Sequence, residues 1–196
     1  MMSFRQSRKI LSPWLCTLVA GCLLSLSSTL PSSELSYEEY DEHFKRYGER
    51  YLPEYDWEWF KAQGYQESRF DRKAVSPAGA RGVMQIMPGT WREETRRLGI
   101  VASPNNARVN ILVGINYMKR MVRFWKAPRT DLERLELAQA SYNAGAGHLL
   151  RAQELCNQER VWNCISPCLV KVTGKASEET LTYVKRIKRW YNGLIR

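Results

Sequence analysis

Glu67 is the acid whose position in the sequence points to proton transfer. Side chains along the predicted helix 57–70 advance by about 100° per residue, which puts Glu67 on the same side as Phe60 and Trp59. Glu58 points the opposite way, toward solvent. A carboxyl group held against aromatic surface loses hydration, which raises its pKa. The sequence therefore favours either a general acid working near neutral pH or a buried glutamate paired with an arginine.

A glycine-rich segment follows this acid. Residues 76–90 contain three glycines and two prolines, which interrupt any regular helix. Gly79 and Gly82 are expected to take positive φ or to let the backbone approach a ligand. Gln85 brings an amide that both donates and accepts hydrogen bonds. Taken alone, the glycines indicate only a tight turn.

Four short motifs in a fixed order resemble a known family. They are Glu67-Ser68, Gly82-Val83-Met84-Gln85, Tyr142-Asn143, and Glu179-Thr180 ahead of Tyr183-Val184. This order is similar to the catalytic domain of soluble lytic transglycosylases, the SLT domain, which has a goose-type lysozyme fold. The resemblance covers roughly 56–193, and several spaced motifs are more specific than any single one. Among the subfamilies, the membrane-bound kind, type F, is the most similar.

The resemblance implies a reaction on peptidoglycan. Glu67 is expected to protonate the β-1,4 oxygen between N-acetylmuramic acid and N-acetylglucosamine, while the sugar's own N-acetyl group steadies the cation. The charged Glu67 then takes the proton of the C6 hydroxyl, and a 1,6-anhydro ring closes without water. The other residues have supporting roles by the same resemblance: Ser68 hydrogen-bonds Glu67, Met84 and Gln85 contact the sugars, Tyr142 and Asn143 shape the cleft, and Tyr183 holds the acid.

The number of carboxylates separates this reaction from its alternatives. Most glycoside hydrolases use two carboxylates, whereas only Glu67 stands in a recognisable motif here. A goose-type muramidase, which needs a carboxylate to hold a water, stays open, as does a non-catalytic wall-binding lipoprotein of the same fold. No cofactor and no metal are expected, because the spacing of Cys156, Cys164, Cys168 and His148 matches no zinc motif.

The N-terminal segment is typical of export. A basic head (Arg5, Arg8, Lys9) precedes an apolar run that ends in a lipobox-like sequence at Cys22. We therefore expect residues 1–22 to be a lipoprotein signal peptide, Cys22 to be lipidated, and 23–33 to form a tether. Leu23 is not the aspartate that retains lipoproteins in the inner membrane, which favours the outer membrane.

Two other fates of this segment stay open. The run 10–30 is long enough to span a bilayer as an uncleaved anchor, and ordinary cleavage near Ser28 is a further alternative. All three place the domain in the cell envelope, on the periplasmic side. In that oxidising compartment Cys156 is expected to form a disulfide with Cys164 or Cys168, leaving one thiol over.

The charge balance suits an anionic partner. The chain has 30 Lys and Arg against 20 Asp and Glu, a net charge of +10. No nucleic-acid motif is present, so peptidoglycan strands and a membrane surface are the expected partners, and protein partners are open. The basic cluster at 185–189 alternates with apolar residues and is interpreted first as the solvated face of a helix and second as a contact with glycan or lipid.

The rest of the sequence predicts helices. Residues 34–55 form an N-terminal helix that Ser33 would cap, and 111–125 repeats apolar residues at helical spacing. A further helix, capped by Asp131, ends at Tyr142-Asn143. We predict an all-α, compact lysozyme-like domain of about seven helices over 56–193, with a catalytic cleft. The expected turns are at Pro53, 76–89, 103–106, 127–130 and 167–175.

Overall fold

A computed structural model describes residues 38–193, which belong to the compact unit 34–196. Within these residues the secondary structure is helical apart from two isolated β-bridges, so the all-α class is confirmed. The predicted signal peptide 1–22, Cys22, the tether 23–33 and Ser33 lie outside the described residues. The elements are α1 (Asp41–Tyr51), α2 (Glu58–Ser68), α3 (Pro88–Leu98), α4 (Ala107–Phe124), α5 (Asp131–Ala144), α6 (Ala146–Leu155), α7 (Trp162–Thr173), η1 (Gly174–Ala176) and α8 (Ser177–Gly193).

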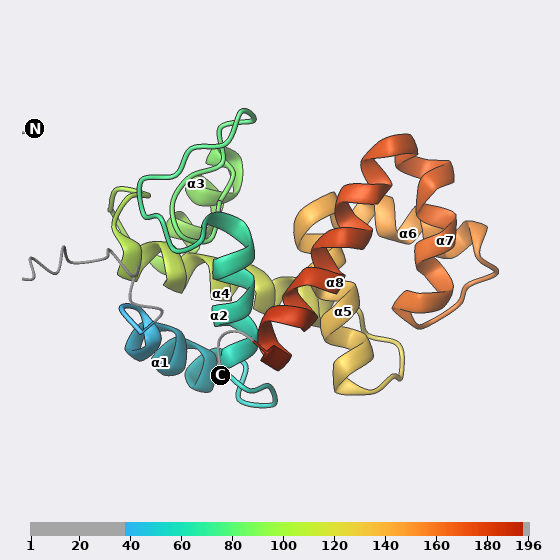
Figure 1. Cartoon of the computed structure of the whole chain (residues 1–196), viewed down its shortest axis with the longest axis horizontal. Coiled ribbons are helices and arrows are strands. Elements are labelled where there is room, and N and C mark those ends of the chain that lie inside the picture. Colours follow the sequence, from blue (N-terminus) through green and yellow to red (C-terminus); the bar gives the residue numbers. More distant parts are fainter. Residues whose placement is uncertain (1–37, 194–196) are drawn as a thin grey trace, which may run out of the picture. The chain divides into compact units, whose positions relative to one another are not determined.

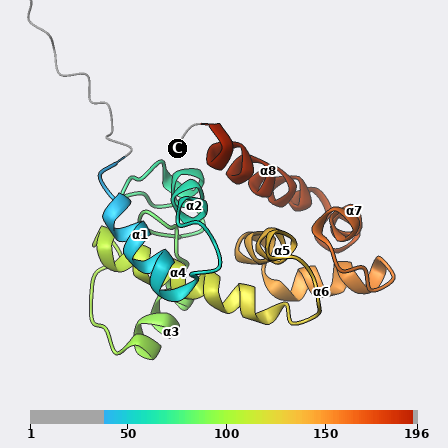
Figure 2. The ribbon, with the colours of Figure 1, turned by 90° about the horizontal axis from the view of Figure 1, so that it is seen from below.

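The last helix joins two groups of helices (Figure 1). Helix α4 packs against α1 and α3, and α2 packs against α1. Helices α6 and α7 pack against each other and against α5. Helix α8 contacts both α2 and α5, and the view from below shows one end of α8 beside α2 (Figure 2). Residues near the C-terminus are thereby brought next to Glu67.

Helix α2 ends earlier than the pattern of apolar residues predicts. It stops at Ser68, and both Arg69 (φ 53°) and Phe70 (φ 67°) take left-handed conformations. Phe70 is buried against the core but lies beyond the end of α2, so the predicted extension of the helix to residue 70 is wrong. Glu67 consequently lies in the last turn of α2, where the chain turns sharply into the glycine-rich segment.

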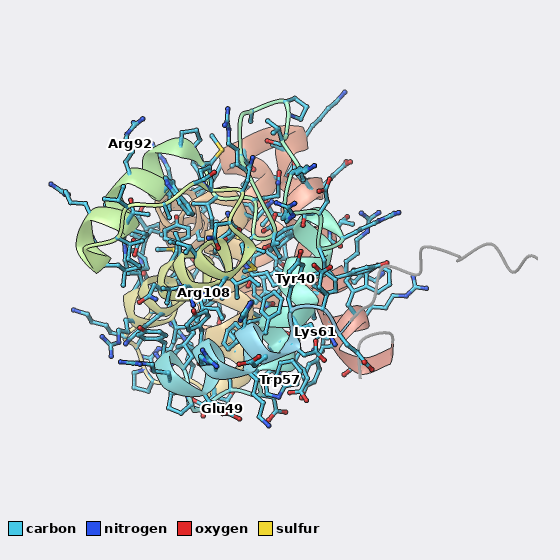
Figure 3. All side chains as sticks on the ribbon, turned by 90° about the vertical axis from the view of Figure 1, so that its left-hand side faces the viewer. Tyr40, Glu49, Trp57, Lys61, Arg92 and Arg108 are labelled. Atoms are coloured by element: carbon cyan, nitrogen blue, oxygen red, sulfur yellow. A yellow bond between two sulfur atoms is a disulfide. The ribbon has the colours of Figure 1, made fainter. Side chains whose placement is uncertain are left out.

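Close packing fixes α2 against α1. A Cβ on Gly64 would lie 2.6 Å from the ring of Phe44, which is fully buried, so only glycine allows this approach. Nearby, the Lys61 amine lies 2.7 Å from a carboxylate oxygen of Asp41 and 5.7 Å from the centre of the Trp57 ring. Figure 3 labels Lys61 and Trp57 beside α1. These contacts hold the middle of α2, before the turn that carries Glu67, against α1.

Two local predictions are wrong. Thr130, not Asp131, caps α5: its hydroxyl accepts a hydrogen bond from the Glu133 amide, and the Glu133 carboxylate accepts one from the Thr130 amide, which is a capping box. The expected turn at 167–175 is also misplaced, because α7 continues through Pro167 to Thr173. Packing of α7 against α6 and α5 compensates for the hydrogen bond that Pro167 cannot donate.

The two cysteines that bond are Cys156, which follows α6, and Cys168 on α7. Cys164 is a free, exposed thiol. The bond closes a loop across 12 positions and fastens α7 to α6. None of the helices within 38–193 has the length and apolar character needed to cross a bilayer.

Candidate active site

Glu67 lies at the wall of a cleft and is held by a tyrosine from the last helix. The Tyr183 hydroxyl donates a hydrogen bond of 2.5 Å to Oε1 of Glu67 across 116 positions of sequence. Tyr183 is buried, whereas Glu67 keeps an edge exposed to the cleft. The carboxyl group is therefore fixed on one side and accessible on the other, as a proton donor must be.

Burial raises the pKa of Glu67 to about 8. Loss of hydration is the main cause, and the nearby charge of Glu179 adds to it, whereas the hydrogen bond from Tyr183 opposes it. No cation is among the causes of the shift. A protonated Glu67 at neutral pH agrees with the general acid predicted from the sequence, and not with a glutamate paired to an arginine.

Ser68 supports the neighbouring loop and does not touch the acid. Its hydroxyl donates to the carbonyl oxygen of Val83 at 2.8 Å. The expected hydrogen bond from Ser68 to Glu67 is therefore wrong. The hydrogen bond from Ser68 to Val83 ties the end of α2 to the Gly82–Gln85 segment, which lines the other side of the cleft.

The Gly82–Gln85 segment is anchored by Asn110 on α4. The Asn110 side chain accepts a hydrogen bond from the Met84 amide at 2.7 Å and donates to the carbonyl oxygens of Arg81 and Pro104 at 3.0 and 2.9 Å. Gly82 takes φ 78°, and a Cβ there would lie 2.4 Å from the Asn110 amide nitrogen. The positive φ predicted for Gly79 and Gly82 is confirmed.

The Met84 side chain belongs to the core and does not line the cleft, and the expected contact of this residue with sugars stays a prediction. Its side chain is fully buried and packs on Gly114 of α4, where a Cβ would lie 2.6 Å from it. Only its backbone reaches the site, since the Met84 carbonyl oxygen accepts a hydrogen bond of 2.8 Å from the Tyr142 hydroxyl. This bond fixes Tyr142, on α5, against the loop.

Gln85 faces the cleft in a strained conformation. Its φ of 45° is left-handed, which costs free energy for a residue with a side chain. The side-chain amide nitrogen of Gln85 donates to the carbonyl oxygens of Gly82 at 2.9 Å and Ala74 at 3.3 Å. These hydrogen bonds hold the strained turn. Strain kept at a cleft wall is typical of functional sites.

Asn143 joins the end of α5 to α8. Its side chain accepts a hydrogen bond of 2.7 Å from the Thr180 hydroxyl and donates one of 3.3 Å to Glu179. Gly145 ends α5 with φ 90°, as expected of a residue after a helix. Asn143 thus positions Glu179 on the cleft wall, beside the wall formed by Tyr142.

The cleft has a volume of about 630 Å³ and receives side chains from α2, the loop 76–87, α5 and α8. It brings together Glu67, Gln85, Tyr142, Asn143 and Tyr183, which are all sequence-predicted site residues. It also contains Glu178 and Glu179, to which no role was predicted, and Arg186 from the basic cluster 185–189. The cleft therefore holds carboxylates besides Glu67, the acid whose pKa burial raises.

Two residues of this site were missed for different reasons. Glu179 stood within a recognised motif but carried no predicted role, and only folding shows that its charge acts on Glu67. Asn110 is a fully buried asparagine in an apolar helical repeat. Buried amides are normally hydrogen-bonded. An asparagine at a predicted core position therefore indicates a residue that anchors another segment of the chain.

No group of three or more side chains suited to holding a metal occurs in the stretch 38–193. The disulfide also occupies two of the three thiols that a zinc site at Cys156, Cys164 and Cys168 would need.

Comparison with known proteins places this cleft in a family. The family model for the transglycosylase SLT domain matches residues 45–165. Curated relatives include the membrane-bound lytic murein transglycosylase F of Vibrio parahaemolyticus, 28% identical over 75% of this chain and 30% of the relative. The protein of the same name from Thiobacillus denitrificans is 31% identical over 79% of this chain and 35% of the relative.

Solved structures agree with these relatives. The 70 kDa soluble lytic transglycosylase of Escherichia coli superimposes with a TM-score of 0.61 at 28% identity, over 79% of this chain and 24% of that one. An inactive mutant of the lytic transglycosylase Slt of Pseudomonas aeruginosa gives a TM-score of 0.61 at 25% identity over 79% of this chain and 24% of that one. The chain thus spans about a third of the length of the curated relatives it matches, and less of the solved ones.

Proposed function

This chain belongs to the transglycosylase SLT domain family, and on that premise we propose that it is a lytic transglycosylase that cleaves peptidoglycan. The bond cut is the β-1,4 linkage between N-acetylmuramic acid and N-acetylglucosamine, and the product carries a 1,6-anhydro ring. The observation that carries this proposal is the Tyr183–Glu67 pair at the cleft wall, with the pKa of Glu67 raised to about 8. Such a carboxyl group can give up a proton and later take one back near neutral pH.

The same carboxyl group serves both chemical steps. Protonated Glu67 gives its proton to the glycosidic oxygen as the bond breaks, and the N-acetyl group of the muramic acid stabilises the positive charge at the adjacent carbon. The Glu67 carboxylate then accepts the proton of the C6 hydroxyl, whose oxygen attacks that carbon and closes the ring. The hydrogen bond from Tyr183 keeps the carboxylate in place between the two steps.

The neighbouring residues shape and support the cleft. Tyr142 lies beside Glu67 and is held by the Met84 carbonyl oxygen, while Gln85 presents its side chain on the loop wall. Asn143 is kept by Thr180 and Glu179. We assign sugar contact to Gln85, Tyr142 and Asn143, and a purely structural role to Ser68 and the Met84 side chain.

A goose-type muramidase is the second candidate, and Glu179 is the observation that favours it. Its carboxylate lies in the same cleft as Glu67, where hydrolysis would need a group to hold a water. Against this, Glu179 already accepts a hydrogen bond from Asn143, and its charge raises the Glu67 pKa. The transglycosylase interpretation needs no second carboxylate.

Digestion of purified peptidoglycan tests the proposal. The transglycosylase releases anhydro-muropeptides, identified by mass as one water lighter than the hydrolysed products. Reducing ends support the muramidase, and release of nothing supports a non-catalytic wall-binding protein. Glu67→Gln keeps the size of the side chain and its acceptor for Tyr183, so it is the matched control and should release nothing. Full activity of Glu67→Gln would overturn the mechanism.

We further propose that the domain works in the periplasm, attached to the outer membrane through a lipid on Cys22. Support comes from the export pattern of residues 1–22 and from the relatives, whose names describe membrane-bound proteins. Labelling with palmitate tests the attachment: Cys22→Ala should abolish both label and processing. If the wild-type protein loses its signal peptide but takes up no palmitate, ordinary cleavage is favoured. If the wild-type protein keeps its N-terminal segment, an uncleaved anchor is favoured.

A further inference from the structure

Gln63 is a buried polar residue whose hydrogen-bonding groups are unmatched. Its side chain on α2 is fully buried, and neither its amide nitrogen nor its amide oxygen makes a hydrogen bond of regular geometry within the described residues. A buried amide without partners destabilises a protein, and an apolar residue of the same size would avoid that penalty. Such a residue is more often kept for function than for stability.

Its place on α2 puts Gln63 one turn before Glu67, on the same face of the helix. Helices α2 and α8 pack antiparallel there, because Glu67 meets Tyr183 while Trp59 stacks on Tyr191 with ring centres 3.8 Å apart. Gln63 lies midway between Trp59 and Glu67, so it faces α8 next to Tyr183. The Gln63 side chain opposes the rise in the Tyr183 pKa, which is the direction expected of a group that donates toward the phenol oxygen.

The hydroxyl of Tyr183 has one proton and can also accept hydrogen bonds. That proton goes to Glu67. With nothing donating to Tyr183, a protonated Glu67 could instead turn its own proton to the tyrosine oxygen. Glu67 would then be stabilised in its neutral form with its proton directed away from the cleft. An amide that donates to Tyr183 from behind opposes this reversal.

We propose that Gln63 is a positioning residue, whose amide donates to the Tyr183 hydroxyl and so keeps the Tyr183 proton on Glu67 and the Glu67 proton in the cleft. This inference rests on the proposed transglycosylase function, because it assigns Gln63 a role in the same proton transfer. The other titratable or charged groups around the Glu67 carboxyl are Tyr142 on α5 and Glu178, Glu179 and Arg186 on α8, none of which the test changes.

Two substitutions test the proposal, Gln63→Leu and Gln63→Met, which remove the amide at nearly constant volume. Each is expected to leave the melting temperature nearly unchanged, because the amide makes no hydrogen bond of regular geometry whose loss would destabilise the fold. The value of kcat on peptidoglycan should fall by about ten-fold, the lower end of what loss of a supporting residue costs at other sites. KM should stay unchanged, since Gln63 does not line the cleft.

A direct titration of Glu67 gives a readout that needs no activity. Carbon-13 NMR of labelled glutamate carboxyls, assigned with Glu67→Gln, measures the pKa in wild type and in both Gln63 variants. We expect the pKa of Glu67 to rise in the variants, toward that of Tyr183→Phe, and the double variant Gln63→Met with Tyr183→Phe to match Tyr183→Phe alone. A purely structural Gln63 predicts a lower melting temperature with an unchanged Glu67 pKa.

The outcomes keep this inference separate from the proposed function. An unchanged Glu67 pKa in both Gln63 variants, or a double variant whose effects add fully, would overturn the role of Gln63 while leaving the wild-type reaction intact. If wild type releases no anhydro product, the proposed function fails, and the role of Gln63 in that reaction fails with it, even if the titration shows the expected shift.

Discussion

Replacing Glu67 with glutamine should stabilise the protein at alkaline pH and leave it unchanged in acid. The pKa of Glu67 is about 8 in the folded protein against an ordinary value of 4.5. Below the ordinary pKa, Glu67 is protonated in both the folded and the unfolded state, so its raised pKa does not lower the free energy of unfolding there. Between the two values the folded state keeps a proton that the unfolded state has lost, and the free energy of unfolding falls by about 1.4 kcal/mol per pH unit.

The full effect appears only above the folded pKa. There the ionised carboxylate remains poorly hydrated, and the deficit reaches at most about 5 kcal/mol, reduced where the cleft lets water reach the exposed edge of Glu67. Glu67→Gln carries no such deficit, because its amide is neutral at every pH. The difference in unfolding free energy between the two proteins should therefore grow steadily from about pH 5 to about pH 8.

Urea denaturation at a series of pH values measures this difference. Comparing the two proteins cancels groups they share, such as His43, whose pKa is lowered by burial and whose effect has the opposite sign. A difference that stays flat within about 0.5 kcal/mol across the series would refute the raised pKa. A glutamine variant that is the less stable protein at alkaline pH would show instead that Glu67 is an ionised residue stabilised by its surroundings.

Three further predictions use other parts of the site. Glu179→Gln removes a charge that raises the Glu67 pKa, so the alkaline limb of kcat/KM should move to lower pH while anhydro products continue to form; loss of all product would favour a catalytic Glu179. Gly82→Ala should lower the unfolding free energy by roughly 2–4 kcal/mol, because of its φ of 78° and its approach to Asn110. The control Gly89→Ala, at an open position, should not destabilise in the same urea experiment. Replacing Cys156 and Cys168 together by serine should cost about 3 kcal/mol in thermal unfolding, whereas Cys164→Ser, at an exposed free thiol, should cost less than about 0.5 kcal/mol; equal effects would contradict the pairing.

Much of the fold follows from local patterns in the sequence. Helical spacing predicts α4 and α5, and the positive φ of Gly79 and Gly82 follows from the glycines themselves. The predictions that are wrong come from rules about local sequence. Pro167 suggested a turn, yet α7 continues through it because its packing against neighbouring helices outweighs one lost hydrogen bond. Thr130 and Asp131 are both good caps, and only Thr130 has a glutamate three residues later.

The site was predictable in its members more than in their contacts. Glu67 and Tyr183 were expected to meet, and they do. The motif that includes Met84 does not reveal that its side chain points into the core while its carbonyl oxygen faces Tyr142. Gln63 carries no sequence signal at all, because its position is defined only once α8 has packed against α2.

Cleavage of peptidoglycan in water enriched with heavy oxygen tests the central claim most directly. If Glu67 acts alone and the C6 hydroxyl is the nucleophile, every new end is an anhydro sugar and none contains oxygen from the solvent. Glu67→Gln should release neither kind of product. New reducing ends that carry the solvent label would contradict the account, because they would require a water held in the cleft, where Glu179 is a candidate to hold it.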